Sequence, residues 1–189
     1  RRVPMGKFQF ETTPIKGLYV VTPTVFGDAR GYFMETYQYE EFCKGGIDVT
    51  FVQDNQSKSR YGVLRGLHFQ TRNAQGKLVR VISGEVFDVA VDLRRDSETF
   101  GKWFGVLLSA ENQKQFYIPA GFAHGFLVTS ETAEFVYKCT NYYDPTSEAG
   151  ILWNDPDIGV AWPIRPDMEI LLSEKDQKQQ SFRTYCEKL

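Results

Sequence analysis

Short stretches of alternating apolar and polar residues recur about every 8 to 15 residues along this chain, separated by Gly, Pro, Asn and Asp. A period of two places successive side chains on opposite faces, which is typical of β-strands. The chain is therefore predicted to be mostly β. Strands are expected at 18–25, 32–37, 49–57, 63–70, 78–82, 85–93, 103–109, 115–118, 125–129 and 133–140.

Helical patterns are few and short. A helix is predicted at 39–44, ended by a glycine pair, and Ser173 begins a Ser-x-x-acid capping pattern that reaches Asp176. Many short strands without long alternating helices favour a double-sheet jelly roll decorated by a few short peripheral helices. One domain is expected over 1–189, with an N-terminal strand region at 1–37, a β core at 49–163 and a C-terminal helical appendage at 164–189.

Composition excludes several classes of protein. The 22 basic and 24 acidic side chains give a net charge of −2, far from the basic balance of a nucleic-acid-binding domain. No apolar run is long enough to cross a membrane. Cys43, Cys139 and Cys186 are odd in number and widely spaced, which fits a reducing compartment. A cytoplasmic protein without nucleic-acid or membrane partners is expected.

The chain has only two histidines, His68 and His124. A three-histidine metal site of the kind found in many jelly-roll enzymes is therefore impossible. Two histidines and one carboxylate could still converge, and the sequence leaves that alternative open. His124 lies in the Pro119-to-Phe126 segment, where a buried, hydrogen-bonded histidine beside a tight turn is as compatible with the pattern as a functional site.

Arg65 and His68 lie three residues apart in one predicted strand. A regular strand would direct them to opposite faces, but Gly66 between them could mark a bulge that turns both to one side. The alternative is a hydrogen-bonded histidine beside a surface arginine. Either interpretation fits this segment alone.

Tyr137 and Lys77 also have two interpretations. The alternation over 133–140 places Tyr137 on the same face as Phe135 and Cys139, where a buried hydroxyl needs a hydrogen-bond partner and the residue could be purely structural. Lys77 follows a turn-like segment and starts a strand, where a solvated lysine is the default. Spacing alone does not assign a chemical role to either residue.

Taken together, six ordered segments between about Leu18 and Asp176 resemble the dTDP-4-dehydrorhamnose 3,5-epimerases of deoxysugar biosynthesis. The resemblance implies a metal-free, cofactor-free cupin-type jelly roll, usually a homodimer with shared active sites, acting on a dTDP-linked 4-keto-6-deoxy sugar. The segments are Asp-Ala-Arg-Gly-Tyr-Phe-Met-Glu at 28–35, Phe-Val-Gln-Asp-Asn at 51–55, Arg-Gly-Leu-His-Phe-Gln at 65–70, Gln-Gly-Lys at 75–77, the 119–126 segment and Tyr-Lys-Cys-Thr-Asn-Tyr-Tyr at 137–143.

The resemblance also implies residue roles. His68 takes the place of the base, Asp176 of the carboxylate that orients it, Tyr137 of the proton donor, and Lys77 of the cation beside the keto oxygen. Glu174 is a nearby alternative to Asp176. Substrate contacts are implied for Arg30, Glu35, Gln53, Asn55, Arg65, His124, Glu148 and Lys175, a stack on thymine for Tyr143, and a second aromatic near the base for Phe26.

The implied reaction accounts for these residue types. C3 and C5 of dTDP-4-keto-6-deoxyglucose flank a ketone, so their protons are acidic enough for a base of near-neutral pKa such as histidine. Inversion needs a second donor on the opposite face, a role for Tyr137. The expected product is dTDP-4-keto-L-rhamnose. The alternative is a single-centre epimerase or a ketoisomerase acting on a related dTDP-4-keto-6-deoxy sugar.

Overall fold

The computed structural model describes residues 6–189, so the first five residues of the expected N-terminal region lie outside it. Over these residues the chain forms thirteen strands and three short helices. The strands are β1 Phe8–Thr12, β2 Tyr19–Pro23, β3 Phe26–Asp28, β4 Gly31–Phe33, β5 Gln53–Arg60, β6 Leu64–Gln70, β7 Lys77–Ser83, β8 Glu85–Asp92, β9 Trp103–Ser109, β10 Gln115–Ile118, β11 Phe122–Val128, β12 Thr132–Cys139 and β13 Glu148–Gly150. The helices are α1 Tyr39–Lys44, α2 Glu174–Gln177 and α3 Phe182–Glu187.

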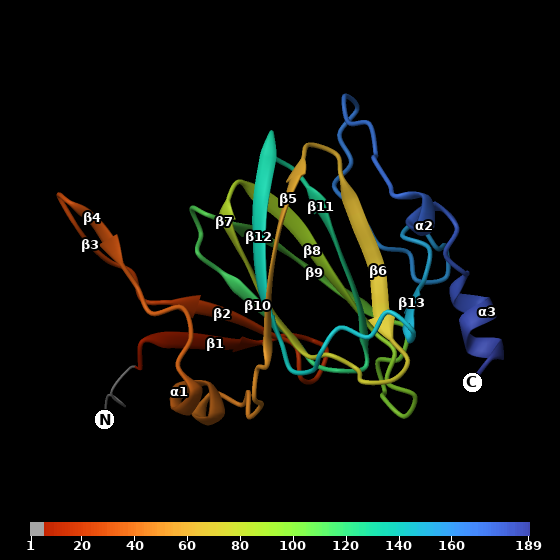
Figure 1. The fold of residues 1–189 in the computed structure, drawn as a ribbon, viewed down its shortest axis with the longest axis horizontal. Helices are drawn as coiled ribbons and strands as arrows, with labels where there is room; N and C mark the ends of the chain where they lie inside the picture. Colours follow the sequence, from red (N-terminus) through yellow and green to blue (C-terminus); the bar gives the residue numbers. More distant parts are fainter. Residues whose placement is uncertain (1–5) are drawn as a thin grey trace.

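Two antiparallel sheets form the body of the molecule (Figure 1). One has the strand order β1-β2-β10-β7-β12-β5 and the other β13-β6-β11-β8-β9. The main core lies between them, where Val79 and Phe135 of the first sheet pack in one cluster with Ala90 and Phe126 of the second. Apolar faces buried between two sheets account for the alternation seen in the sequence. The predicted mostly β, cupin-type double-sheet jelly roll is confirmed.

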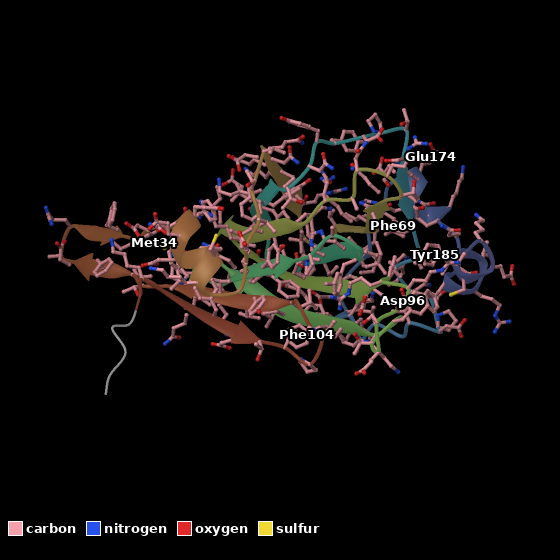
Figure 2. All side chains as sticks on the ribbon, turned by 90° about the horizontal axis from the view of Figure 1, so that it is seen from below. Met34, Phe69, Asp96, Phe104, Glu174 and Tyr185 are labelled. Carbon is pink, nitrogen blue, oxygen red and sulfur yellow. The ribbon has the colours of Figure 1, made fainter. Side chains whose placement is uncertain are left out.

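Strand β8 shows how the two faces of one strand meet different surroundings. Val86 and Ala90 point into the main core, whereas Val89 and Val91 pack on the outer side against the C-terminal segment. That segment contributes a second apolar cluster through Ile151, Ile158, Trp162, Phe182 and Tyr185. Figure 2 shows Phe69 and Tyr185 close together at this end of the molecule, and their ring centroids are 5.3 Å apart.

The N-terminal strand predicted at 32–37 differs most from the structure. The strand β4 ends at Phe33 because it pairs only with β3, and Phe26 opposite Phe33 is the last pair in that register. The resulting hairpin projects away from the two sheets (Figure 1), and Met34 lies at the opposite end of the molecule from Tyr185 (Figure 2). The alternating pattern therefore predicted too long a strand, because the pairing of β4 with β3 ends at Phe33.

Three strands, β1, β3 and β13, were not predicted. Strand β1 lies at the edge of its sheet and pairs only with β2, and β13 is only three residues long, too short for a period to be recognised. The helix at 39–44 is confirmed, with Gln38 as its N-cap and Gly45 as its C-cap. No helix within 6–189 is both long and apolar enough to cross a membrane.

Candidate active site

Two adjoining cavities, of about 470 and 610 Å³, lie between the sheets and the C-terminal segment. They share five lining residues, so they meet at one polar centre. The five are His68, Lys77, His124, Tyr137 and Glu148, and the sequence had singled out each of them.

The bulge considered at Gly66 is present. His124 of β11 pairs with His68, but Phe126, two residues later, pairs with Arg65, three residues before His68, so β6 carries one extra residue. Gly66 has φ +126°, and a Cβ there would lie 2.6 Å from the Cα of Gly125. Glycine is therefore required at this close approach. The bulge lets Arg65 and His68 line the same cavity.

His68 is paired with Asp176. The Nε2 atom of His68 lies 2.5 Å from Oδ1 of Asp176, and the exposed fractions of the two side chains are 30% and 4%. Ser173 caps α2 and accepts a hydrogen bond from the Asp176 N–H, which fixes the carboxylate beneath β6, where it also accepts from the Gly66 N–H. Burial raises the pKa of Asp176, but the hydrogen bonds from His68 and Gly66 oppose this and leave it below its usual value. Glu174 is exposed.

A second pair, His124 with Asp88, lies deeper. Nε2 of His124 is 2.9 Å from both carboxylate oxygens, and the side chain of Asp88 is fully buried. Burial raises the pKa of Asp88 and lowers the pKa of His124. Sequence reasoning did not select Asp88. An acidic residue inside the otherwise apolar run Val86 to Val91 was the available signal, because a buried carboxylate needs a partner.

The facing sheet supplies Lys77 from β7 and Tyr137 from β12, with the Lys77 Nζ 5.6 Å from the centre of the Tyr137 ring. Lys77 is half-buried, and burial lowers its pKa. Burial also raises the pKa of Tyr137, while a hydrogen bond from the Asn55 side chain lowers it. Both side chains line the two cavities, so Lys77 is directed into the cavity rather than to bulk solvent.

Glu148 connects two further predicted residues. Its Oε2 accepts hydrogen bonds from the Tyr143 hydroxyl at 2.8 Å and from the Lys175 Nζ at 2.5 Å. Burial raises the pKa of Glu148, but these two donors outweigh it and leave the pKa lowered. Gln53 is not among the cavity-lining residues; it holds the Tyr143 N–H and the Asn55 side chain. Tyr143, Glu148 and Lys175 form one side of the cavity rim.

Three predicted residues of the N-terminal region also do not reach the cavity of their own chain. Phe26 is exposed on the projecting hairpin. The Arg30 side chain is 91% exposed and pairs with Asp28 at 2.7 Å, and Glu35 accepts a hydrogen bond from Lys7 at 2.8 Å. Within one chain, therefore, the N-terminal region contributes none of the three to the site.

The chain matches the family model of dTDP-4-dehydrorhamnose 3,5-epimerase over residues 12–184. It belongs to this family. A dTDP-4-dehydrorhamnose 3,5-epimerase from Salmonella typhimurium is 60% identical over 166 residues, covering 87% of this chain and 90% of the relative.

Solved structures agree in fold. A dTDP-6-deoxy-D-glucose-3,5-epimerase from Legionella pneumophila in complex with dTDP-4-keto-L-rhamnose is 49% identical, with a TM-score of 0.90 and 93% coverage of each chain. A 3'-monoepimerase from Streptomyces bikiniensis in complex with dTDP-quinovose is 34% identical, with a TM-score of 0.86, covering 93% of this chain and 88% of that one.

Proposed function

We propose that this epimerase inverts C3 and C5 of dTDP-4-keto-6-deoxyglucose to give dTDP-4-keto-L-rhamnose, with His68 as base and Tyr137 as acid. The observation that carries the assignment is their placement: His68 comes from β6 of one sheet and Tyr137 from β12 of the facing sheet, and both line the same cavity. A sugar ring held between the two walls would present one face to each residue, as inversion requires.

His68 abstracts the proton. Because a carboxylate only accepts hydrogen bonds, Asp176 retains the ring proton on Nε2 and leaves the Nδ1 lone pair free toward the cavity. The C–H bond breaks, its electrons move into the enolate, and the proton passes to Nδ1. Asp176 then stabilises the imidazolium, so it acts as a positioning residue.

Lys77 stabilises the charge that develops on the C4 oxygen. An ammonium in a half-buried position interacts with an oxyanion more strongly than it would in water. Tyr137 then delivers its hydroxyl proton to the opposite face of the carbon, which leaves a phenolate next to the cation. One round transfers one proton to His68 and one from Tyr137. Solvent exchange resets both groups before the second centre reacts.

Nucleotide binding uses the rim. Arg65 and Lys175 are the lining cations suited to a diphosphate, and Tyr143 offers an aromatic surface to thymine. Gln53, Asn55, His124 and Glu148 are the remaining proposed contacts within the chain. No metal or cofactor is needed for the proposed steps. The free thiols of Cys43, Cys139 and Cys186 suit a reducing compartment, and we place the activity in the cytoplasm.

We further propose a homodimer with shared sites. Exposed apolar side chains cover the projecting hairpin, including Phe26 and Phe33, and such a surface favours burial against a partner. Arg30 of the partner subunit would then complete the diphosphate site. Phe26 of the partner subunit and Glu35 of the partner subunit would complete the nucleotide pocket.

Subunit mixing tests this arrangement. In heterodimers of His68→Asn and Arg30→Ala chains, one site collects both defects and the other is intact, so activity should recover to about half the wild-type level. Verified heterodimers that remain inactive, with both parents folded, would show that each site lies within one chain.

The reaction itself is tested by NMR of dTDP-4-keto-6-deoxyglucose with enzyme in D2O. Deuterium should enter at both C3 and C5, and both centres should invert. Inversion at one carbon would establish the single-centre alternative, and movement of the ketone would establish a ketoisomerase.

The division of roles is tested by Tyr137→Phe. This variant should lose inversion while exchange continues, because the base is intact. Equal loss of exchange and inversion would contradict the assignment of Tyr137 as the acid.

A further inference from the structure

We infer that Gln70 is a positioning residue for nucleotide recognition. Its side-chain amide holds the backbone on both sides of Tyr143, so that the Tyr143 ring is in place before a planar base arrives. The inference rests on the proposed role of Tyr143 as the residue that stacks on thymine. It assigns a task to a buried polar side chain that the proposed reaction does not use.

In the segment that carries Tyr143, side chains replace the backbone as hydrogen-bond acceptors. Residues 140–147 belong to no helix or strand, and Tyr143 is 53% exposed. The N–H groups of residues 142, 143 and 144 donate in turn to side-chain oxygens of Asn141, Gln53 and Gln70. The shape of this segment therefore depends on those side chains.

Gln70 makes three hydrogen bonds, two of them to this segment. Its Nε2 donates to the carbonyl oxygens of Asn73 at 2.8 Å and Tyr142 at 3.3 Å. Its Oε1 accepts from the Asp144 N–H at 2.9 Å. Tyr142 and Asp144 are the chain neighbours of Tyr143, so one amide bonds to the residues before and after the proposed stacking residue.

These partners fix the direction of the Gln70 amide. Two carbonyls need a donor and one N–H needs an acceptor, so only the observed orientation satisfies all three. Gln70 is only 9% exposed, so water does not readily replace these partners. The amide is therefore a fixed support for the segment rather than a mobile surface group.

Strand pairing places the support for the other end of the Tyr143 side chain next to Gln70. Gln70 of β6 lies directly opposite Glu148 of β13, and Glu148 accepts the hydrogen bond from the Tyr143 hydroxyl at 2.8 Å. Gln70 also follows His68 by two residues, and both line the same cavity. One pair of strands thus holds the backbone and the hydroxyl of Tyr143 beside the proposed base.

Ordering the ring before binding should determine affinity. If only a fraction of the molecules hold Tyr143 in its binding position, the apparent dissociation constant rises by the inverse of that fraction. Thymine does not react, so we expect its stacking contact to be the same in the substrate complex and in the transition state. Loss of such a contact raises KM and leaves kcat unchanged.

Gln70→Glu and Gln70→Met test the inference. The carboxylate still accepts from the Asp144 N–H but cannot donate, and methionine has a similar length but makes none of the three hydrogen bonds. In both variants the dissociation constant of dTDP and the KM for dTDP-4-keto-6-deoxyglucose should rise about tenfold, with kcat within about threefold of wild type. Titration calorimetry and steady-state kinetics measure these quantities.

Arg72→Ala is the matched control. The Arg72 Nη2 donates to the Thr146 Oγ1 at 3.1 Å and so connects the same two loops, 71–76 and 140–147. Its side chain is exposed, lies outside the cavity linings and does not contact the neighbours of Tyr143. The dissociation constant of dTDP should stay within about twofold of wild type.

Tyr143→Ala, alone and combined with Gln70→Met, shows whether Gln70 acts through Tyr143. If it does, the double variant should bind dTDP within about twofold of Tyr143→Ala alone. Effects that multiply in the double variant, or a fall in kcat with unchanged dTDP affinity in the Gln70 variants, would overturn the inference. If Tyr143→Ala binds dTDP as tightly as wild type, the proposed stacking role of Tyr143 is wrong instead.

Discussion

The two histidine–carboxylate pairs are cross-strand neighbours with unlike surroundings. His68 pairs with Asp176 from the C-terminal segment and keeps 30% of its side chain exposed, whereas His124 pairs with Asp88 from the adjacent strand β8 and is only 8% exposed. Figure 1 shows the corresponding placement: α2, which carries Asp176, lies beside β6, and β11 lies within its sheet.

The difference in exposure distinguishes a histidine that can act as a base from one that is held in the core. A base must meet its substrate on one ring nitrogen while the other is held, which His68 can do. Burial instead lowers the pKa of His124 and raises the pKa of Asp88, so this pair resists becoming charged. The ring of His124 also stacks on Phe135 at 6.1 Å, as a core residue does. Identical side-chain types thus take different roles because their depths differ.

The largest effect is expected for His68→Asn. Both deuterium exchange and inversion should fall by about a thousandfold or more, because no other group in the proposed mechanism can serve as the base. The free energy of unfolding should change by only about 1 kcal/mol, since Asp176 keeps the Gly66 N–H as a partner. NMR in D2O and urea unfolding measure the two quantities. Substantial exchange in this variant would show that the base lies elsewhere.

His124→Asn makes the same chemical change in the buried pair. It leaves the fully buried Asp88 without its hydrogen-bond partner, so the free energy of unfolding should fall by about 2 kcal/mol. Urea unfolding beside His68→Asn provides the comparison. Equal stability losses in the two variants would remove the distinction drawn between the pairs.

Asp176→Asn tests the carboxylate that orients the base. The amide can still accept from His68 but cannot stabilise the imidazolium, so turnover should fall about a hundredfold. Glu174→Gln, a neighbouring acidic residue with an exposed side chain, is the control and should retain wild-type turnover. The opposite ranking would transfer the orienting role to Glu174.

The contribution of Asp176 to the free energy of unfolding should depend on pH. Its folded-state pKa lies below the unfolded value, so its contribution is present above about pH 3.9 and is lost as pH falls through the folded pKa. The stability difference between wild type and Asp176→Asn should therefore shrink from pH 6 to pH 3. Urea unfolding across this range measures it. A difference that stays constant with pH would mean that Asp176 has the same pKa in both states.

Chelation should have no effect on activity. Each histidine is paired with one carboxylate, and residues 6–189 contain no group of three His, Cys, Asp or Glu side chains that could hold a metal ion. Full activity after exhaustive dialysis against EDTA is expected. Activity that returns only on adding a divalent metal would assign one of the pairs to a metal site.

The sequence by itself determined most of the strands, the short helix at 39–44 and which positions share a face. These features depend on side-chain alternation and capping within a few residues, so local patterns suffice. Tyr137 on the inward face of its strand with Phe135 is one example. The resemblance supplied the family, which the comparisons confirm.

The tertiary structure decided which distant groups meet. His68 and Asp176 are 108 positions apart, and His124 and Asp88 are 36 apart, so their contacts depend on strand register and on how the C-terminal segment packs. The bulge at Gly66 likewise appears only when β6 is aligned with β11. An alternating pattern fixes a residue's face but not the strand opposite it or its depth, and depth decides whether a histidine can exchange a proton with a substrate.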